Sequence, residues 1–554
     1  MLPAAATPKR IGQLRSRLFG LSDPIATPEM ATYTPPSVDL NEPAGEIAEP
    51  ATHLGANVAG AQDEMIDMAR GSVEGGVVQG AVPDLPPYEN FRVGSISAQP
   101  GDLLQQPLQL QLAGSILPVD TFFLFVNPSS GGNQAGTFTS AGVETLIFKH
   151  PAPAQVHIFD ITEGQHGDKP GFRKLKAEVA SVAAATPAGT QPRRVRCLAA
   201  GGDGTVLWAL SELEAHGVAL DSVAVGVIPY GTGNDFSRAL GWVSSRTARA
   251  WAEAALHFRA LLTRWLHAEV TRFDLWNVEV HIQQGGSIQK IDSKTRKKKK
   301  LLDTDNTPIL TKSSTFCNYF SCGFESKVGI GFDRNRKKSA LANKMVYMTE
   351  GMKKMYCCHS IMKIDEIFEK MVKKNSDGTE EVVFMGVEHG KHAAQSKDDT
   401  AHPYFAKQPV SLVAINIGSM MGGCDVWRNA GRKVNLKNVD KATVEKLKSS
   451  PQNMGDKQLE FITFPSGSAF GMEQVFPGQG YRVHQGPGPW ELTFRRDLGD
   501  TRVYIQIDGE FYQLDHPDRI LLRHDKQVNV LDASEKKIPK KITKAEVAKF
   551  EKES

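Results

Sequence analysis

The sequence predicts an α/β fold in which a doubly wound domain is followed by a β-rich domain. Three apolar runs, at 122–126, 195–200 and 223–228, each end in a glycine- or asparagine-rich turn that precedes a helical pattern. In a parallel sheet such turns gather at one carboxyl edge. From residue 271 onward, alternating runs such as 271–280 indicate strands instead of helices.

The chain divides into four predicted parts, because 554 residues are too many for one core. Residues 1–118 are rich in Pro, Ala, Gly and acidic side chains, which predicts a disordered leader. Residues 119–267 alternate between strand and helix patterns, and residues 268–532 are β-rich. We expect polar insertions near 284–313, 374–408 and 431–457, and a Lys-rich tail over 533–554.

The distribution of charge and the spacing of the cysteines indicate in which compartment the protein lies and which partners it binds. The leader carries a net charge of −7, whereas the rest of the chain carries +10. The six cysteines show neither CxxC pairs nor zinc-finger spacing, which is typical of reduced intracellular thiols. No apolar run is long enough to span a membrane. We therefore expect a cytoplasmic protein that binds membranes peripherally, and nothing in the sequence indicates a nucleic acid or an obligate protein partner.

The middle turn is the centre of the predicted site. Its glycines Gly201, Gly202 and Gly204 surround Asp203, and Thr205 begins a helical pattern. A glycine turn between a strand and a helix binds phosphate, because unpaired N–H groups and the helix dipole both attract an anion. A carboxylate in such a turn suggests a cation between it and the phosphates.

Two flanking turns have the same setting. The first contains Asn127, Ser129, Gly131 and Gly132. The second, after Pro229, contains five further candidates for phosphate binding, Gly231, Thr232, Gly233, Asn234 and Asp235. The chain has no GxxxxGK[ST] motif, so the glycine turns themselves are the candidate phosphate site.

In this order the three motifs, NPSSGG, GGDGT and PYGTGND, resemble the diacylglycerol kinase family. The resemblance covers residues 119–532 apart from the insertions, and it includes NYFSCGFE at 318–325 and IDGE at 507–510. Glu325 stands where the family usually has Asp. The chain lacks the cysteine-rich C1 zinc modules that many of these kinases carry.

The resemblance implies a Rossmann-like ATP-binding catalytic domain over 119–267 and a sandwich-like accessory domain over 268–532. It implies ATP-dependent phosphorylation of the primary hydroxyl of 1,2-diacylglycerol in a membrane, giving phosphatidic acid for lipid signalling. Such a transfer needs phosphate donors, a Mg²⁺ anchor and a carboxylate near the acceptor. Asp203 is the candidate Mg²⁺ ligand, and Asp508 or Glu510 would orient or deprotonate the lipid hydroxyl. Without the resemblance, Asp508-Gly509 indicates a hairpin turn.

Two other functions stay open. One is a related kinase for ceramide, sphingoid bases or NAD, although Gly201 and Thr205 differ from the SGDGL that is usual in sphingosine kinases. The other is a non-catalytic lipid-binding scaffold.

Several further patterns allow a functional and a plain structural interpretation. The basic run 296–300 is typical of a solvated loop, but with 334–338 it could dock the protein on an anionic lipid surface. Methionines 345, 348, 352 and 355 share a helical face and are expected as core residues. Adjacent Cys357 and Cys358 could carry acyl groups, and the histidines at 389, 392 and 402 are expected in loops.

Overall fold

The structure is a computed structural model of the chain. It describes residues 91–93, 110–112, 115–117 and 120–130 and, with gaps, residues 134–534. The gaps are 137–138, 140–143, 149–153, 186–193, 232, 243–254, 293–294, 336–345, 347–348, 354–361, 388–401 and 500. All of the described residues belong to one compact unit.

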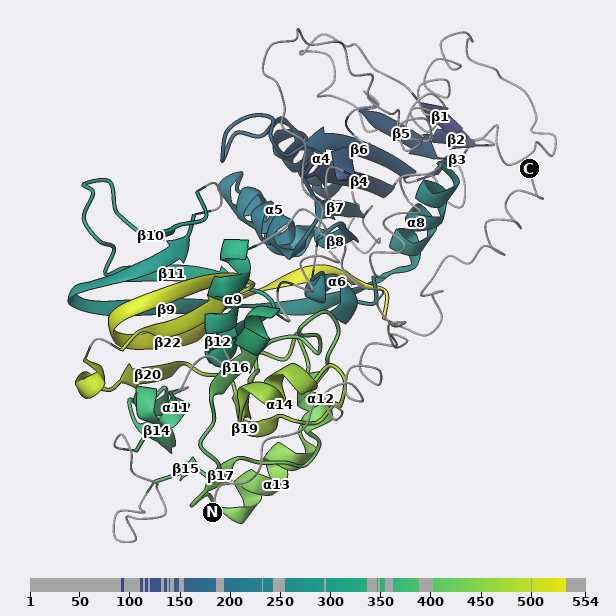
Figure 1. Cartoon of the computed structure of the whole chain (residues 1–554). Coiled ribbons are helices and arrows are strands. Elements are labelled where there is room, and N and C mark those ends of the chain that lie inside the picture. The colour runs from purple at the N-terminus through teal and green to yellow at the C-terminus, as the bar shows by residue number, and fades with distance from the viewer. Residues whose placement is uncertain are drawn as a thin grey trace, which may run out of the picture. The chain divides into compact units, whose positions relative to one another are not determined.

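A parallel sheet forms the first half of the described chain (Figure 1). Strands β4 (Asp120–Val126), β6 (Ala154–Asp160), β7 (Val195–Gly201) and β8 (Ala224–Pro229) lie in the order β6-β4-β7-β8. Every residue of β7 and β8 is buried, as strands covered on both faces require. An antiparallel strand, β5 (Thr145–Phe148), lies beside β6.

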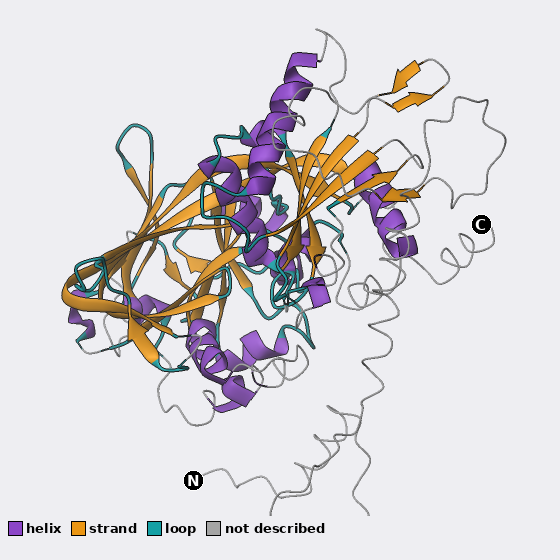
Figure 2. Ribbon diagram, turned by 90° about the horizontal axis from the view of Figure 1, so that it is seen from above, coloured by secondary structure: helices purple, strands orange, loops and turns teal. Residues whose placement is uncertain are grey.

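Helices cover both faces of this sheet (Figures 1 and 2). Side chains of β4 alternate between them: Phe125 stacks on Phe172 of α4 (Pro170–Ala185), and Phe122 contacts Trp265 of α8 (Ala255–His267). Helix α5 (Asp203–Ala215) follows β7, and the short α6 (Asp235–Ala239) follows β8. The predicted doubly wound α/β fold is therefore confirmed.

Two 23-residue strands, β9 (Glu269–Ile291) and β22 (Glu510–Asp532), connect this sheet to the rest of the chain. They pair with each other antiparallel, and the end of β22 pairs in parallel with β8 at Val225. Val530 and Leu531 of β22 are buried in the same core as β4 and β7. The division of the chain into two domains at residue 267 stays a prediction. Strand β22 belongs to the predicted second domain by its sequence position but pairs with β8 of the first.

The second half is β-rich, as expected. Its strands are β11 (Thr311–Phe316), β12 (Tyr319–Gly323), β13 (Phe368–Lys374), β14 (Glu380–Met385), β16 (Ser411–Ile415), β18 (Leu459–Phe464), β19 (Tyr481–Gly486), β20 (Trp490–Phe494) and β21 (Val503–Ile507). Strand β12 lies between β16 and β21, and β20 lies between β13 and β22. Trp276 of β9, Phe461 of β18 and Trp490 pack together in its core.

Short helices lie around these strands. They are α9 (Phe324–Asn335), α11 (Ile364–Ile367), α12 (Val426–Ala430), α13 (Lys441–Ser449) and α14 (Gly467–Met472). Two minor strands, β15 (Tyr404–Phe405) and β17 (Leu436–Lys437), pair with each other.

The expectation of a solvated loop at the basic run holds for Arg296 and Lys297, which are exposed and outside any strand, but it is wrong for residues 298–300. Strand β9 continues to Ile291, and β10 (Lys298–Lys300) pairs with it antiparallel. Lysine tolerates this position because its long stem packs along a strand while its ammonium group reaches polar partners. The insertions near 374–408 and 431–457 also contain regular elements, β14 and β15 in the first and α13 and β17 in the second.

Part of the predicted leader contains strands. The strand β1 (Phe91–Val93) pairs antiparallel with β5, and β2 (Leu110–Leu112) pairs with β3 (Ser115–Leu117). Pairing with an existing sheet edge requires no core of its own for β1, whereas β2 and β3 pair only with each other, and the disordered leader over 1–118 stays a prediction. The other residues of the leader lie outside the described residues, as do His389, His392, Cys357, Cys358, and Met345, Met348 and Met355.

Candidate active site

The three predicted turns meet at the carboxyl ends of β4, β7 and β8. The N–H of Asn127 donates to the Ala200 carbonyl at 3.0 Å, and its side-chain amide donates to Thr205 Oγ1 at 3.4 Å. The N–H of Tyr230 donates to the Gly201 carbonyl at 2.8 Å. The Asn127 carboxamide oxygen also accepts from Ser129. Among the predicted site residues, Gly131, Gly132 and Thr232 lie outside the described residues.

Gly202 and Gly231 bring two turns into backbone contact. A Cβ on Gly231 would lie 2.6 Å from the Gly202 Cα, and a Cβ on Gly202 would lie 3.2 Å from the Gly231 Cα. At Gly201 a Cβ would meet the Thr205 hydroxyl. These glycines are therefore needed for packing, independently of any ligand.

Gly204 differs from its neighbours because a Cβ there would meet no atom of the described residues within 4 Å. It lies in the first turn of α5, whose N-cap residue Gly202 contributes no side-chain hydrogen bond. A 13-residue helix therefore begins with backbone N–H groups that no capping side chain satisfies, beside open space. This end of α5 fits a phosphate group.

Asp203 is the most perturbed carboxylate of the site. Although the residue as a whole is only partly buried, its carboxylate is enclosed. Oδ2 accepts from the N–H groups of Asp235 and Phe236, at 3.0 and 3.4 Å, and from Asn318 Nδ2 at 2.9 Å. Oδ1 is buried and has no hydrogen-bond partner among the described residues. Burial, followed by the negative charge of Asp235, raises the pKa of Asp203 to about 7.

Asp235 connects α6 to the second half of the chain. Its Oδ1 accepts from Ser419 Oγ at 3.0 Å and from the Gly422 N–H at 2.9 Å, and its Oδ2 accepts from the Tyr319 hydroxyl at 3.1 Å. Burial raises its pKa against these hydrogen bonds. Each carboxylate oxygen accepts at least one hydrogen bond, so Asp235 holds α6 against the second half of the chain, and its role in nucleotide binding stays a prediction.

Asp508 lies in the two-residue turn between β21 and β22, with φ of +45° followed by +83° at Gly509. The hairpin interpretation of this pair is confirmed. Its Oδ2 accepts from the Cys317 N–H at 2.7 Å, and its Oδ1 accepts from the N–H groups of Asn318 and Tyr319 at 2.9 and 3.0 Å. Burial raises the pKa of Asp508 despite these three donors. Asp508 therefore holds the residues that contact Asp203 and Asp235.

Glu510 is placed differently from Asp508. Its side chain is exposed, accepts a hydrogen bond from the Tyr512 hydroxyl and lies 4.0 Å from the Lys290 ammonium. The structure thus brings Asp203, Asp235 and Asp508 together through Asn318 and Tyr319, whereas Glu510 faces solvent.

Asn318, Tyr319, Ser419 and Gly422 are site residues to which the sequence patterns assigned no role. The first two belong to the NYFSCGFE motif, and the other two lie in the glycine turn after β16. Glu325 of the same motif is buried in α9 and accepts from Ser411 and Ser326. Burial raises its pKa to about 7. Its longer side chain contacts these serines and none of the three aspartates.

The residues present fit a Mg²⁺–nucleotide. Within the described part of the chain, Asp203 Oδ1 is a buried carboxylate oxygen without a hydrogen-bond partner, and the helix end at Gly204 lies one residue away. Within the described residues no group of three or more His, Cys, Asp or Glu side chains forms a ready-made metal site. Mg²⁺ does not require one, because it binds through one or two carboxylates, water and substrate phosphates.

Among the residues that the structure describes, no helix is long and apolar enough to cross a membrane.

Comparison with known proteins supports the interpretation of both halves. The diacylglycerol kinase catalytic domain model matches residues 121–260, and the diacylglycerol kinase accessory domain model matches residues 315–511. Together these matches cover more than half of the chain.

Similar curated proteins carry the same family name. The chain is 26% identical over 449 residues to diacylglycerol kinase 1 of Arabidopsis thaliana, covering 79% of this chain and 48% of that protein. It is 28% identical over 412 residues to diacylglycerol kinase 3 of the same plant, covering 70% of this chain and 75% of that protein. A crystal structure of a diacylglycerol kinase from Bacillus anthracis covers 75% of this chain and 97% of its own, at 14% identity and a TM-score of 0.31. The chain thus spans about half the length of the first relative.

The ordered glycine turns, the aspartates that they hold and the matches to both domain models lead to one conclusion: the chain belongs to the diacylglycerol kinase family.

Proposed function

We propose that this chain transfers the γ-phosphoryl group of ATP to the primary hydroxyl of diacylglycerol, giving phosphatidic acid. The observation that carries the proposal is the buried Oδ1 of Asp203, which has no hydrogen-bond partner among the residues that the structure describes and lies beside the start of α5, where the N-cap Gly202 provides no side-chain cap. Phosphoryl transfer depends on positioning and charge stabilisation, and this arrangement offers both.

The glycine turns would hold the nucleotide. The N–H groups at the start of α5 face the open space at Gly204, where phosphates can approach the backbone. Asn127 and Ser129 border the same edge. Asp203 would hold Mg²⁺, which when bound neutralises charge on the phosphates. Residues 119–267 would together form the catalytic domain that binds ATP.

On the acceptor side we assign positioning to Asp508. Its carboxylate accepts hydrogen bonds from the N–H groups of residues 317–319, which fixes Asn318 against Asp203 and Tyr319 against Asp235. Glu510, whose carboxylate is exposed, is the better candidate to accept the proton of the lipid hydroxyl. An accessory domain over 268–532 would present both groups.

A panel of lipid acceptors with labelled ATP tests the activity. We expect Mg²⁺-dependent labelling of diacylglycerol to exceed that of ceramide and sphingosine, because the chain carries GGDGT at 201–205 and matches both family domains. Faster labelling of ceramide or sphingosine would show that this lipid, and not diacylglycerol, is the preferred acceptor. Lipid binding without any labelling would favour the non-catalytic scaffold.

The proposal includes reversible contact with a membrane on its cytoplasmic side. Diacylglycerol resides in a bilayer, and the predicted +10 charge of the region after residue 118 favours an anionic surface. The described cysteines are free, as in a reducing compartment. Much of the 334–338 cluster lies outside the described residues.

An exposed apolar turn beside the site is the candidate contact. Val475 and Phe476 are 56% and 55% exposed. Buried Glu473 closes the turn behind them by accepting from the N–H groups of Gly478 and Gln479, at 3.0 and 2.6 Å. A turn held so firmly with two apolar tips suits insertion into a lipid interface.

The turn is coupled to the catalytic aspartates by a short path. Gln474 Nε2 donates to the Met421 carbonyl at 2.7 Å, and the next residue, Gly422, donates to Asp235. Replacing both Val475 and Phe476 by Ser should weaken sedimentation with vesicles about tenfold or more, while activity on detergent-dispersed substrate is retained. Val270→Ser is the matched control, because Val270 is 50% exposed on β9. Equal binding by both variants would exclude this turn as the contact.

A further inference from the structure

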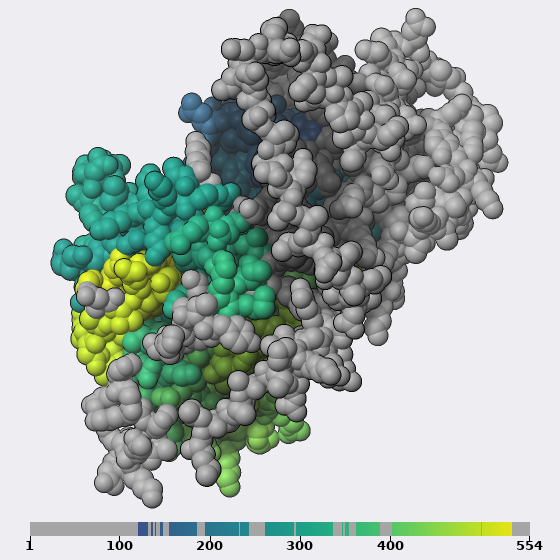
Figure 3. Space-filling view, viewed as in Figure 1, coloured from purple at the N-terminus to yellow at the C-terminus, as the bar shows by residue number. Residues whose placement is uncertain are grey.

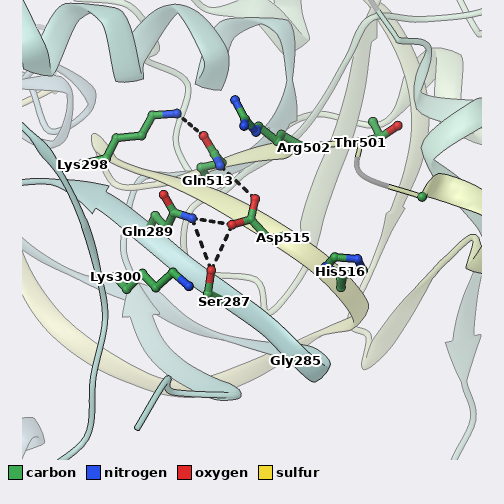
Figure 4. A pocket seen from close by; sticks show the side chains of 11 residues that line it. Gly285, Ser287, Gln289, Lys298, Lys300, Thr501, Arg502, Gln513, Asp515 and His516 are labelled. Carbon is green, nitrogen blue, oxygen red and sulfur yellow. Dashed lines mark hydrogen bonds between the residues drawn. The ribbon is translucent and has the colours of Figure 1, made fainter. Parts of the chain in front are cut away.

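A polar cavity lies on the ribbon formed by β9, β10 and β22. Its volume is about 560 Å³, and it is lined by Gly285, Ser287, Gln289, Lys298, Lys300, Gly499, Thr501, Arg502, Gln513, Asp515 and His516 (Figure 4). In the space-filling view the teal surface near residue 300 borders the yellow surface of β22 on the visible face (Figure 3).

The floor of the cavity is an ordered hydrogen-bond network. Asp515 Oδ2 accepts from Ser287 Oγ at 3.0 Å and from Gln289 Nε2, and its Oδ1 accepts from Gln513 Nε2 at 2.9 Å. Ser287 and Gln513 are both 2% exposed. All of these donors to Asp515 are neutral, so no lysine or arginine donates a hydrogen bond to the Asp515 carboxylate among the described residues.

Three cationic side chains surround this floor. Lys298 and Lys300 lie on the same face of β10 because side chains alternate along a strand, and Lys298 donates to Gln513 Oε1. Arg502 comes from the start of β21 on the opposite side (Figure 4). Against them stands one lining carboxylate, that of Asp515, so the lining has a formal charge of +2 with His516 neutral.

We propose that this cavity binds a phosphomonoester anion. A dianion matches the excess positive charge, the Arg502 guanidinium can pair with two phosphate oxygens, and the lysines add point charges. The cavity contains none of the catalytic aspartates: Arg502 and Asp508 lie at opposite ends of β21, six residues apart, or about 20 Å along a strand, whereas Gln513 on the cavity floor lies three residues from Glu510 on β22. This gives the basic run 296–300 a specific role on a strand.

The phosphate could belong to a lipid headgroup or to a soluble molecule, and the test separates the two. Glycerol 3-phosphate is titrated into the full chain while a non-hydrolysable ATP analogue saturates the catalytic site. Sedimentation is then measured with vesicles that contain either phosphatidic acid, a phosphomonoester, or phosphatidylserine, a phosphodiester, at equal surface charge.

The variants are Lys300→Gln and Arg502→Gln, with Lys299→Gln as the matched control. Lys299 lies on the same strand as Lys300, but its side chain points to the opposite face of β10. Its substitution by Gln removes the same charge. We expect each cavity variant to weaken glycerol 3-phosphate binding about tenfold, and the control to bind as the parent does. Basal activity on detergent-dispersed diacylglycerol should be unchanged. The binding difference between the cavity variants and the control requires no catalytic turnover, so its failure can be told apart from a failure of the proposed function.

The vesicle arm identifies the source of the phosphate. Selective loss of binding to phosphatidic acid vesicles by Lys300→Gln, relative to Lys299→Gln, assigns a lipid headgroup. Equal vesicle binding together with the loss of glycerol 3-phosphate binding assigns a soluble ligand. Failure of the parent protein to bind either phosphomonoester, or equal losses in Lys299→Gln and Lys300→Gln, would overturn the proposal.

Discussion

Replacing Asp203 by Asn should abolish phosphoryl transfer and at the same time stabilise the ligand-free protein at alkaline pH. All three hydrogen-bond donors to Asp203 reach Oδ2, so the asparagine oxygen can take its place, and the amide NH₂ takes the place of unpartnered Oδ1. The substitution removes a buried charge without disturbing the contacts around it.

The magnitude follows from the pKa. Burial and the charge of Asp235 raise the pKa of Asp203 from 3.8 to about 7, so the folded protein holds an extra proton between these values. The free energy of unfolding therefore falls as the pH rises from about 4 to about 7, by about 4 kcal/mol in total. Because an amide also costs free energy to bury, we expect Asp203→Asn to recover about 2 kcal/mol at pH 8.

The assay is thermal unfolding of both proteins across pH, without nucleotide. The variant should melt at a higher temperature than the parent at pH 8, and the difference should shrink toward pH 5, where Asp203 is already protonated. Mg²⁺–ATP should stabilise the parent more than the variant, because only the parent retains the anionic oxygen. A variant that is less stable at pH 8, or a difference that does not change with pH, would refute the reasoning.

Three further predictions test other parts of the site. Asp508→Asn should destabilise the protein by about 1–2 kcal/mol in chemical denaturation, in contrast to Asp203→Asn, because donors reach both oxygens and one must face an amide N–H; increased stability would contradict the positioning role. Gly204→Ala should leave the melting temperature nearly unchanged but raise the KM for ATP, whereas Gly202→Ala should lower both stability and activity. An unaffected KM in Gly204→Ala would contradict the proposal that the ATP phosphates bind at the start of α5. Deleting residues 1–88 should preserve activity on detergent-dispersed diacylglycerol, whereas deleting 1–110 removes β1 from the sheet edge and should reduce stability; equal stability of the two truncations would show that β1 is dispensable.

The sequence by itself determined the fold class and the position of the phosphate site. Buried parallel strands require continuous apolar runs, and a turn that must approach phosphate requires glycine, so both leave local patterns. That is why the runs ending at Val126, Ala200 and Ile228 predicted the sheet edge, and why Gly201 to Thr205 located its centre.

Only the tertiary structure decided the roles of the carboxylates. Asp203, Asp235 and Asp508 look alike in sequence, but their hydrogen-bond donors come from residues up to about 190 positions away, so nothing local distinguishes the one with a free oxygen. Asn318 and Tyr319 joined the site for the same reason. The basic run at 296–300 was also undecided locally, because a lysine strand is stable only when a partner such as β9 supplies its hydrogen bonds. Local patterns fix which backbone a segment can adopt, whereas the partner of each side chain depends on contacts that form only when the whole chain has folded.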